Sequence, residues 1–233
     1  MEAVILAGGK GTRLHPYTTE IPKPLVTVGD KPIIEYLLRR MKASGVHKVY
    51  LAVNHLAHLL MAVMGDGQRF GIEIVYSRED AELSTVAPIK LISGLPENFL
   101  VVNGDVLTDL DFTALFDNHI SSKVKVTVAT TQRSTAIDYG VLETGPSGLV
   151  SGFREKPTFH FTVSMGVYVF SREVLRLVPD NQKFGFDDLM LTMLARGEPI
   201  NTYPYDGYWL NVNHPDDYEQ ANHDIEKIKR LLL

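Results

Sequence analysis

The arrangement of apolar and polar positions differs between the two halves of the chain. In the first half, short continuous apolar runs alternate with segments whose apolar residues recur at helical spacing. The runs predict buried strands at residues 4–6, 49–53, 72–76 and 99–102. The periodic segments predict a helix between a cap at Asp30 and a stop at Gly45, and further helices over 56–64 and 86–94. Strands that are apolar throughout and alternate with helices favour a mostly parallel sheet covered by helices.

The second half is richer in strands, which the pattern predicts at 124–130, 139–143, 149–153 and 162–170. Helices near 172–178 and 186–196 follow, and a terminal helix begins after Pro215. Asp111 precedes a further helical run, where it fits as an N-terminal cap. Since no repeat, low-complexity tract or linker interrupts the chain, we expect one α/β domain with a doubly wound, mostly parallel and Rossmann-like sheet.

The composition narrows the classes of function. The 233 residues carry a formal net charge of −5 and contain no basic run, which argues against nucleic acid as a substrate or partner. The chain has no cysteine, which excludes disulfides and thiolate chemistry. The N-terminal apolar run is too short for a signal peptide, and no run reaches membrane-spanning length. We therefore expect a soluble, cytoplasmic protein without a membrane partner.

One segment carries most of the candidate chemistry. Residues 8–25 read GGKGTRLHPYTTEIPKPL and follow the first predicted strand. Three glycines in four positions let the loop turn with its backbone N–H groups facing inward, where they can hold phosphate oxygens. Lys10 and Arg13 add charge to this loop, and Lys23 follows between two prolines that restrict its backbone. Such a stiff, cationic, glycine-lined rim suits a polyphosphate.

Two commoner phosphate motifs do not fit this segment. Residues 9–14 lack the third glycine of the dinucleotide-binding fingerprint, and Lys10 is followed by Gly11 rather than by the Ser or Thr of a P-loop. A glycine pair after a strand can also be a plain strand-to-helix turn. The full eighteen-residue pattern closely resembles the signature GGxGTRLxPxTxxxPKPL of the sugar-1-phosphate nucleotidyltransferases and matches it at every fixed position.

This resemblance implies a fold and an activity. The fold is a single nucleotidyltransferase domain over residues 1–233, with a nucleotide-binding half at about 1–110 and a sugar-phosphate-binding half at about 111–233. The activity is transfer of a nucleotidyl group from a nucleoside triphosphate to a sugar 1-phosphate with Mg²⁺, releasing pyrophosphate. The chain is most similar to the short heptose- and mannose-phosphate guanylyltransferases and to compact uridylyltransferases. Many relatives assemble through sheet edges and terminal helices, so a homo-oligomer is compatible with the resemblance.

The resemblance also assigns candidate residues on the nucleotide side. The candidate catalytic residues are Arg13 for the leaving phosphates, Lys23 for the α-phosphate, and Asp105 for Mg²⁺. The candidate nucleotide-binding residues are Leu6, Ala7, Gly8, Gly9, Gly11, Thr12, Arg13, Glu79, Ser84, Asn103 and Gly104. Asp105 follows the fourth predicted strand, and ligands of open α/β sheets bind beyond such strand ends. Gly-Asp after an apolar strand is, however, usually only a turn.

Later segments resemble the family's sugar-side motifs. Tyr139-Gly140 and Phe153–Pro157 look like its YG and F-x-EKP segments. By this resemblance Glu155 accepts sugar hydroxyls and Lys156 meets the sugar phosphate, although adjacent opposite charges usually form an exposed ion pair. Ser164 begins a segment similar to the strand that lines the sugar pocket. The candidate substrate-binding residues are therefore Tyr139, Gly140, Glu155, Lys156 and Ser164.

Glu79 falls where the family places a residue that contacts the base edge. A carboxylate can accept two hydrogen bonds from guanine N1–H and N2–H₂, but it would face carbonyl acceptors on thymine or uracil. This favours GTP, with UTP, dTTP and CTP as alternatives. A solvated surface glutamate explains the same position equally simply.

Two departures from the family pattern bear on activity. Asn211 stands where the family usually has a second magnesium-binding Asp, and Asn213 stands where it has a glycine. An amide oxygen can still ligate Mg²⁺ without bringing a charge, so Asp105 and Asn211 are the candidate metal ligands. Ser84 puts a side chain where a glycine normally lets the backbone approach the nucleotide. These departures support a competing hypothesis, a catalytically weak or silent relative that acts as a sensor or partner subunit.

Overall fold

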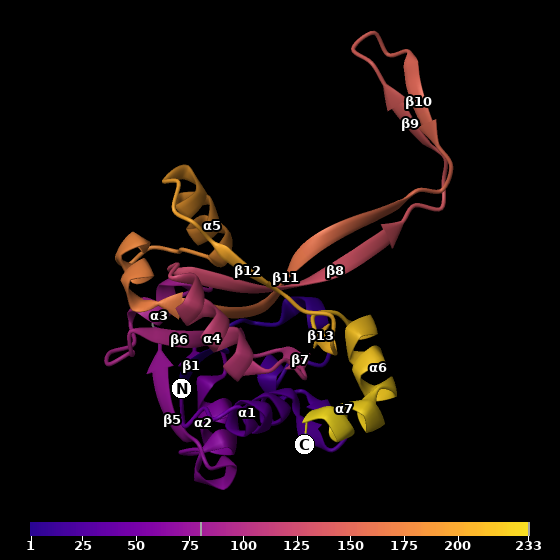
Figure 1. The fold of residues 1–233 in the computed structure, drawn as a ribbon. Helices are drawn as coiled ribbons and strands as arrows, with labels where there is room; N and C mark the ends of the chain where they lie inside the picture. The colour runs from indigo at the N-terminus through magenta and orange to yellow at the C-terminus, as the bar shows by residue number, and fades with distance from the viewer. Residues whose placement is uncertain (80, 233) are drawn as a thin grey trace.

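The computed structural model describes residues 1–79 and 81–232, and a seven-stranded sheet lies at its centre (Figure 1). In spatial order its strands are β12 (Asn201–Pro204), β8 (Val126–Ala136), β11 (Thr158–Ser171), β6 (Asn98–Asn103), β1 (Glu2–Leu6), β4 (Lys48–Val53) and β5 (Glu73–Arg78). β11 is antiparallel to both β6 and β8, and the other neighbouring pairs are parallel. The predicted doubly wound, mostly parallel α/β fold is therefore confirmed.

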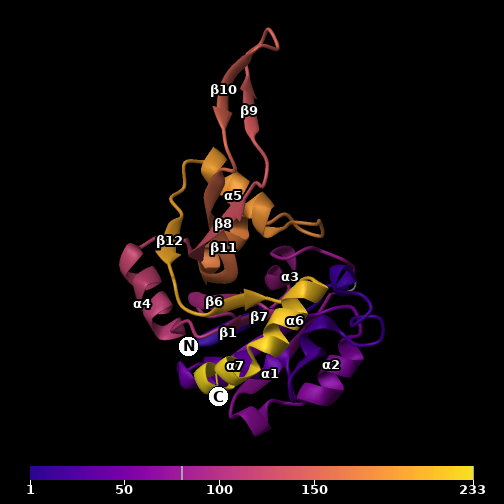
Figure 2. The same cartoon turned by 90° about the vertical axis from the view of Figure 1, so that its right-hand side faces the viewer.

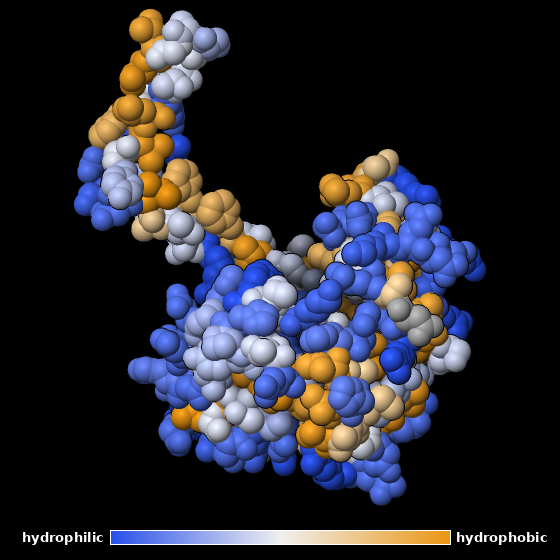
Figure 3. All heavy atoms as spheres, turned by 180° about the vertical axis from the view of Figure 1, so that it is seen from behind, coloured by the Kyte–Doolittle hydropathy of each residue, from blue (hydrophilic) through white to orange (hydrophobic). Residues whose placement is uncertain are grey.

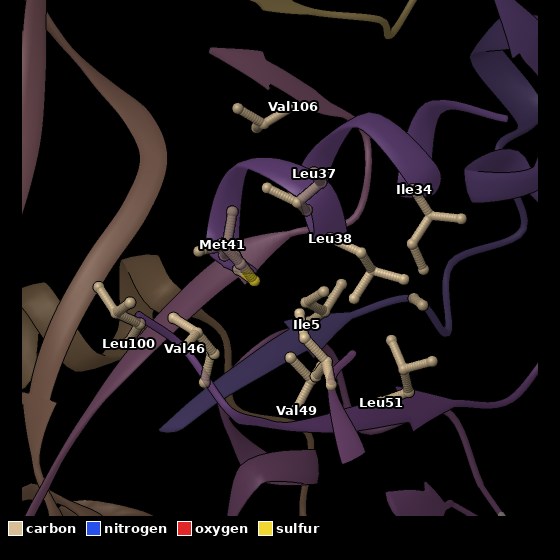
Figure 4. Close-up of a cluster of buried hydrophobic side chains, with 14 of the residues drawn as sticks. Ile5, Ile34, Leu37, Leu38, Met41, Val46, Val49, Leu51, Leu100 and Val106 are labelled. Carbon is tan, nitrogen blue, oxygen red and sulfur yellow. The ribbon is translucent and has the colours of Figure 1, made fainter. Parts of the chain in front are cut away.

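Helices cover both faces of this sheet. α1 (Ile33–Ala43), α2 (Ala57–Met64) and α4 (Phe112–Ser122) contribute to the core on one face, and α3 (Ala87–Lys90) and α5 (Phe186–Ala195) to the core on the other. Figure 4 shows Leu38 and Met41 of α1 above Ile5 in the first core. Val4, one residue earlier in β1, belongs to the second core, because successive strand side chains point to opposite faces.

A third, smaller core lies beneath the C-terminal segment. α6 (Pro215–His223) and α7 (Ile225–Leu232) pack there with the short strands β7 (Val106–Thr108) and β13 (Trp209–Asn211), which pair with each other. A second short pair, β2 (Thr27–Val28) and β3 (Lys31–Pro32), leads into α1. The β7–β13 pairing places Asn211 opposite Val106, and so brings the end of the chain to the end of β6.

Three local predictions need correction. α1 begins at Ile33 after Pro32, and Asp30 does not cap it. The Asp30 carboxylate pairs with Lys229 and Lys31, which lower its pKa to about 2. The helix predicted over 86–94 ends at Lys90, because the following turns tighten to bonds between residues three apart, such as Leu91 N to Pro88 O.

The single predicted terminal helix is two helices. The break falls at Asp224, whose backbone N–H closes α6 on Gln220 O while its carboxylate lies 3.4 Å from Tyr208 Oη. The prediction of an N-terminal cap at Asp111 is confirmed, since its carboxylate accepts hydrogen bonds from the N–H groups of Thr113 and Ala114. The helix predicted over 186–196 is α5, and the helix predicted near 172–178 is a 3₁₀ helix (Arg172–Leu177).

An arm projects from this body (Figures 1 and 2). Beyond the sheet, β8 and β11 continue as a two-stranded ribbon, with Thr131 paired to Val163 and Ala136 to Thr158. The hairpin of β9 (Val141–Thr144) and β10 (Val150–Arg154) forms the tip. We call residues 131–163 the arm. Both views show its tip standing clear of the helices that cover the sheet.

The helices bear on one further question. In the part of the chain that the structure describes, no helix combines the length and the apolar character needed to cross a membrane.

Candidate active site

A cleft of about 430 Å³ lies at the carboxyl ends of the parallel strands. The loop after β1 forms one wall, and Ala52 of β4 and Glu79 beyond β5 continue it. Asn103, Gly104 and Asp105, at the end of β6, form part of its lining. Ligands of open α/β sheets bind beyond these strand ends, because that is where loops from several strands converge.

The glycine loop has the close approaches that the sequence predicts. A Cβ on Gly8 would lie 2.6 Å from Glu79 Oε1, so a larger residue would not fit against that carboxylate. Gly11 has φ +64, a left-handed conformation that L side chains rarely adopt, and its carbonyl accepts a hydrogen bond from Thr18 Oγ1. A 3₁₀ turn over Thr12–Leu14 then buries Leu14 and sets Arg13 on the cleft wall.

The structure brings the predicted nucleotide-side residues together. The cleft lining contains Leu6, Ala7, Gly8, Gly9, Gly11, Thr12, Arg13, Lys23, Glu79, Ser84, Asn103, Gly104, Asp105 and Asn211. Lys10, the other cation of the loop, is 65% exposed and lies 3.8 Å from Glu82 instead. The two loop cations therefore differ in position, and Arg13 is the one that lines the cleft.

Asn213 connects the two cations of the cleft. Its Oδ1 accepts hydrogen bonds from Lys23 Nζ at 2.6 Å and from Arg13 Nη2 at 3.2 Å. Its own backbone N–H donates to the Asp217 carboxylate, which fixes the loop before α6. The sequence treats Asn213 only as the replacement of a glycine. Its side-chain amide, two residues beyond Asn211, was the available signal for a cleft residue.

Lys23 also forms an ion pair with Asp105 through Oδ2 of that carboxylate. The second carboxylate oxygen, Oδ1, is buried and has no hydrogen-bond partner among the described residues. Asn211 Oδ1 is in the same condition. The backbone bond from Val212 N to Asp105 O, at 3.0 Å, joins the two segments that carry these oxygens.

Two unpartnered buried oxygens fit a hard cation. Burying such acceptors without a partner costs free energy, and a cation would recover it. The described residues contain no cluster of three or more carboxylate, imidazole or thiol groups that could hold a metal. A pair of oxygens suits Mg²⁺, which takes one or two protein ligands when phosphates complete its shell. The residues present therefore fit the ion that the sequence predicts.

Glu79 is not the solvated surface glutamate that the sequence allows. Its side chain is 7% exposed, and its Oε2 accepts a hydrogen bond from Leu83 N at 2.9 Å. Burial raises the pKa of its carboxyl above the ordinary value. The group is held at the cleft wall with Oε1 facing Gly8, which positions it for a donor on a bound base.

Ser84 lines the cleft in a strained conformation. Its φ is +73, the left-handed region in which a glycine would be unstrained. The neighbouring Thr85 also lines the cleft and accepts a hydrogen bond from Phe186 N. The sequence-based list missed five other lining residues, which carry little chemical signal in isolation or depend on the fold: Pro24, Ala52, Glu82, Thr85 and Pro88.

The predicted sugar-side residues divide into two groups. Ser164 Oγ donates to Tyr168 Oη, and Tyr168 lines a small pocket of about 160 Å³ together with Leu6 and Asn103, which also line the cleft. The other four residues lie in the arm and are absent from the described lining of the cleft: Tyr139, Gly140, Glu155 and Lys156. Lys156 pairs there with Asp138 at 2.8 Å rather than with the adjacent Glu155.

Comparison with known proteins identifies the family. A family model described as nucleotidyl transferase matches residues 2–228. The UTP–glucose-1-phosphate uridylyltransferase of Synechocystis is 33% identical over 95% of this chain. This chain belongs to the sugar-1-phosphate nucleotidyltransferase family. The mannose-1-phosphate guanylyltransferase of Mycobacterium tuberculosis is 32% identical to this family member over 97% of the chain. The chain spans 62% of the length of the first relative and 64% of the second.

Solved structures agree with the fold. The crystal structure of HddC from Yersinia pseudotuberculosis in complex with GMP-PN has a TM-score of 0.74 at 23% identity, over 96% of this chain and 99% of that one. A putative glucose-1-phosphate thymidylyltransferase from Bacillus anthracis has a TM-score of 0.73 at 20% identity, over 96% of this chain and 94% of that one. At these identities the likeness extends to the nucleotidyltransferase fold and no further.

Proposed function

We propose that this chain transfers a nucleotidyl group from a nucleoside triphosphate to a sugar 1-phosphate. One observation carries the proposal. The glycine loop, two cations and the two unpartnered oxygens of Asp105 and Asn211 meet in a single cleft at the carboxyl ends of the strands. Membership of the family supports the same activity, since its named relatives are uridylyl- and guanylyltransferases of sugar 1-phosphates.

The transfer needs positioning and charge neutralisation more than covalent help from the protein. A phosphate oxygen of the sugar 1-phosphate forms a bond to the α-phosphorus. The bond from that phosphorus to the bridging oxygen breaks, and pyrophosphate leaves with the electron pair. No general base is required, because a sugar phosphate is ionised at neutral pH. Arg13 and the N–H groups of the glycine loop hold the leaving phosphates, where charge-assisted hydrogen bonds are strongest.

Lys23 serves the α-phosphate. Its ammonium is mostly buried and already ordered by Asp105 and Asn213, so it loses little side-chain entropy when a phosphate oxygen joins these partners. Asn213 also orders Arg13, and the two cations therefore keep a fixed relation to each other. This pre-ordering favours a triphosphate placed along the glycine loop.

Asp105 and Asn211 are the residues that would hold Mg²⁺. The ion supplies positive charge to the phosphates of the substrate. With one carboxylate and one neutral amide, the protein contributes a single negative charge to the ion, and Lys23 competes for part of it. We therefore expect an active enzyme with an elevated magnesium requirement.

The proposed nucleotide is GTP, and Glu79 carries this choice. Its buried, oriented carboxylate can accept hydrogen bonds from the guanine edge, whereas uracil and thymine would present carbonyl oxygens to it. The named relatives include enzymes for both guanine and uracil nucleotides. UTP, dTTP and CTP are the alternatives that the experiment must separate.

The test is synthesis of NDP-sugar and pyrophosphate from each of the four triphosphates with a panel of sugar 1-phosphates and Mg²⁺. The proposal predicts turnover that is fastest with GTP. Glu79→Gln should reduce the preference for GTP over UTP, because an amide can donate to a pyrimidine carbonyl. Equal use of all triphosphates by the wild-type chain would contradict the role of Glu79. Binding of a triphosphate by calorimetry without any turnover would favour the sensor or partner subunit.

A further inference from the structure

The tip of the arm has one apolar and one charged face. In the β9–β10 register, Leu142 lies opposite Phe153, and Thr144 opposite Val150. These cross-strand pairs share a face because residues two apart on a strand point the same way. On the other face Glu143 forms an ion pair with Arg154 at 3.1 Å. The hairpin therefore resembles a strand pair that is built to be covered on one side.

In the structure the apolar side chains of the arm are uncovered. More than half of the surface of each is exposed for Tyr139, Leu142, Leu149, Val150, Phe153 and Phe161. Figure 3 shows apolar side chains running along the arm. Together they expose on the order of 600 Å², since a large side chain carries about 150–250 Å². This matches the largest patch on a typical monomer, about 300–600 Å², and a lone hairpin is only marginally stable in water.

The cleft has too few cations for two phosphorylated substrates. Among its described lining residues the cations are Arg13 and Lys23, set against the carboxylates of Glu79, Glu82 and Asp105. Lys23 is already engaged with Asp105. If these two cations serve the triphosphate, the phosphate of the sugar needs another positive charge from outside the described lining.

That charge is carried at the neck of the arm. Lys156 lies between β10 and β11 with φ +41, a left-handed conformation that a non-glycine residue adopts at an energetic cost. Glu155 lies beside Gly140, where an added Cβ would be 3.4 Å from its Oε2. Strained, paired polar residues of this kind mark ligand sites, yet here they stand apart from the cleft of their own chain.

The ribbon that carries this neck runs outward. β8 and β11 pair in an uninterrupted register from Thr130 with Ser164 to Ala136 with Thr158, and the arm leads away from the body in both ribbon views. The body itself presents a second uncovered apolar pair, Leu191 and Leu194 of α5, each 66% exposed. One chain thus offers both a projecting apolar surface and a separate apolar surface that could receive it.

We infer that the arm binds a second copy of this chain and completes that copy's sugar-phosphate site with Lys156 and Glu155. In a two-fold dimer each arm lies over the partner and each cleft receives one arm, so both contacts form twice. Two arms and the surfaces that they cover would bury roughly 2,000 Å², the size of a stable dimer interface. The role of Lys156 rests on the proposed function, whereas the association through the apolar face does not.

Sedimentation equilibrium of the full chain tests the association. The wild-type chain should be a dimer at micromolar concentration, and the double variant Leu142→Glu, Phe153→Glu should be a monomer because its apolar face becomes charged. Glu143→Gln, on the opposite face of the same hairpin, should remain a dimer. Unchanged far-UV circular dichroism of the double variant would show that the body is folded. A monomeric wild-type chain, or a dimeric double variant, overturns the inference.

Complementation tests the shared site. Asp105→Asn has an intact arm and a damaged cleft, and Lys156→Ala has the reverse; each alone should lose at least about tenfold in rate. After subunit exchange, an equal mixture should recover about a quarter of the wild-type rate, because half of the dimers carry one intact site. No recovery, or a fully active Lys156→Ala, overturns the shared site. A wild-type chain without turnover refutes the proposed function instead, and sedimentation then decides on the arm.

Discussion

Asn211 shows how a single neutral oxygen sets the charge of the cleft. Its Oδ1 is buried without a partner in the described part of the chain, as is Oδ1 of Asp105. If both hold Mg²⁺, adding a negative charge at 211 should strengthen the site. Asn211→Asp should therefore lower the magnesium concentration that gives half-maximal synthesis, while Asp105→Asn should nearly abolish turnover. A magnesium titration of the three proteins measures this, and an unmoved midpoint in Asn211→Asp would place residue 211 away from the ion.

Ser84 carries a cost that can be measured separately from activity. A left-handed conformation costs a non-glycine residue about 1–2 kcal/mol, whereas a glycine loses about 0.5–1 kcal/mol of extra backbone entropy on folding. Strain relief is the larger effect at φ +73, so Ser84→Gly should raise the free energy of unfolding by roughly 0.5–1 kcal/mol. Urea denaturation checks it. Ser77→Gly, within β5, is the control and should destabilise; a destabilised Ser84→Gly would mean that the strain is absent.

The limit of sequence reasoning at this scale is visible in Asn213. The glycines, Arg13 and Asp105 follow predicted strands, so their positions at the sheet edge could be inferred from the chain alone. Asn213 matters because it reaches Lys23 and Arg13, which are 190 and 200 residues away in the sequence. A contact over such a distance depends on the β7–β13 pairing, which no local pattern announces.

At the scale of elements, long periodic segments were predictable and short ones were not. The strands that became β4 and β6 and the helices α1 and α2 have apolar patterns that leave little choice. β7, β12 and β13 have three or four residues and exist because neighbours pair with them. The terminal helical pattern continues across Asp224, so periodicity could not reveal the break there.

α4 carries a buried histidine that should make stability depend on pH. The ring nitrogens of His119 lie 2.9 Å from Thr127 Oγ1 and 3.2 Å from Asn98 Oδ1 and Ser171 Oγ. Burial lowers the pKa of this imidazole below its ordinary value of 6.5. The unfolded chain therefore takes up a proton at a higher pH than the native state does, and the stability from His119 is present above pH 6.5 and is lost as the pH falls below it.

The expected slope is at most about 1.4 kcal/mol per pH unit, the value for one proton. Urea denaturation of the wild-type chain between pH 8 and pH 5 should give unfolding free energies that decline below about pH 6.5. His119→Gln should flatten this decline, while His58→Gln, at an exposed position on α2, should leave it in place. Equal slopes in wild type and His119→Gln would show that this histidine does not titrate with folding.

At the scale of the whole molecule, the cleft joins the beginning, middle and end of the chain. The loop after β1, the end of β6 and the segment after β13 meet there, so both predicted halves contribute to it. Its cations are local features of a chain with a net charge of −5. The fold class and this edge of the sheet could be predicted because parallel strands deliver their loops to one side. The arm could not, since alternating strands at 124–170 do not say whether a hairpin packs on the body or leaves it.

The central claim is that this cleft, and within it Arg13, holds the triphosphate during transfer. The most direct measurement compares the rates of NDP-sugar synthesis by Arg13→Ala and Lys10→Ala. Both remove one cation from the same loop, but Arg13 lines the cleft and Lys10 lies near Glu82 outside it. Loss of a charge-assisted contact worth about 1.5–3 kcal/mol predicts a rate at least about tenfold lower for Arg13→Ala and a nearly unchanged rate for Lys10→Ala. An Arg13→Ala protein as fast as wild type, or equal losses in the two variants, would contradict the account.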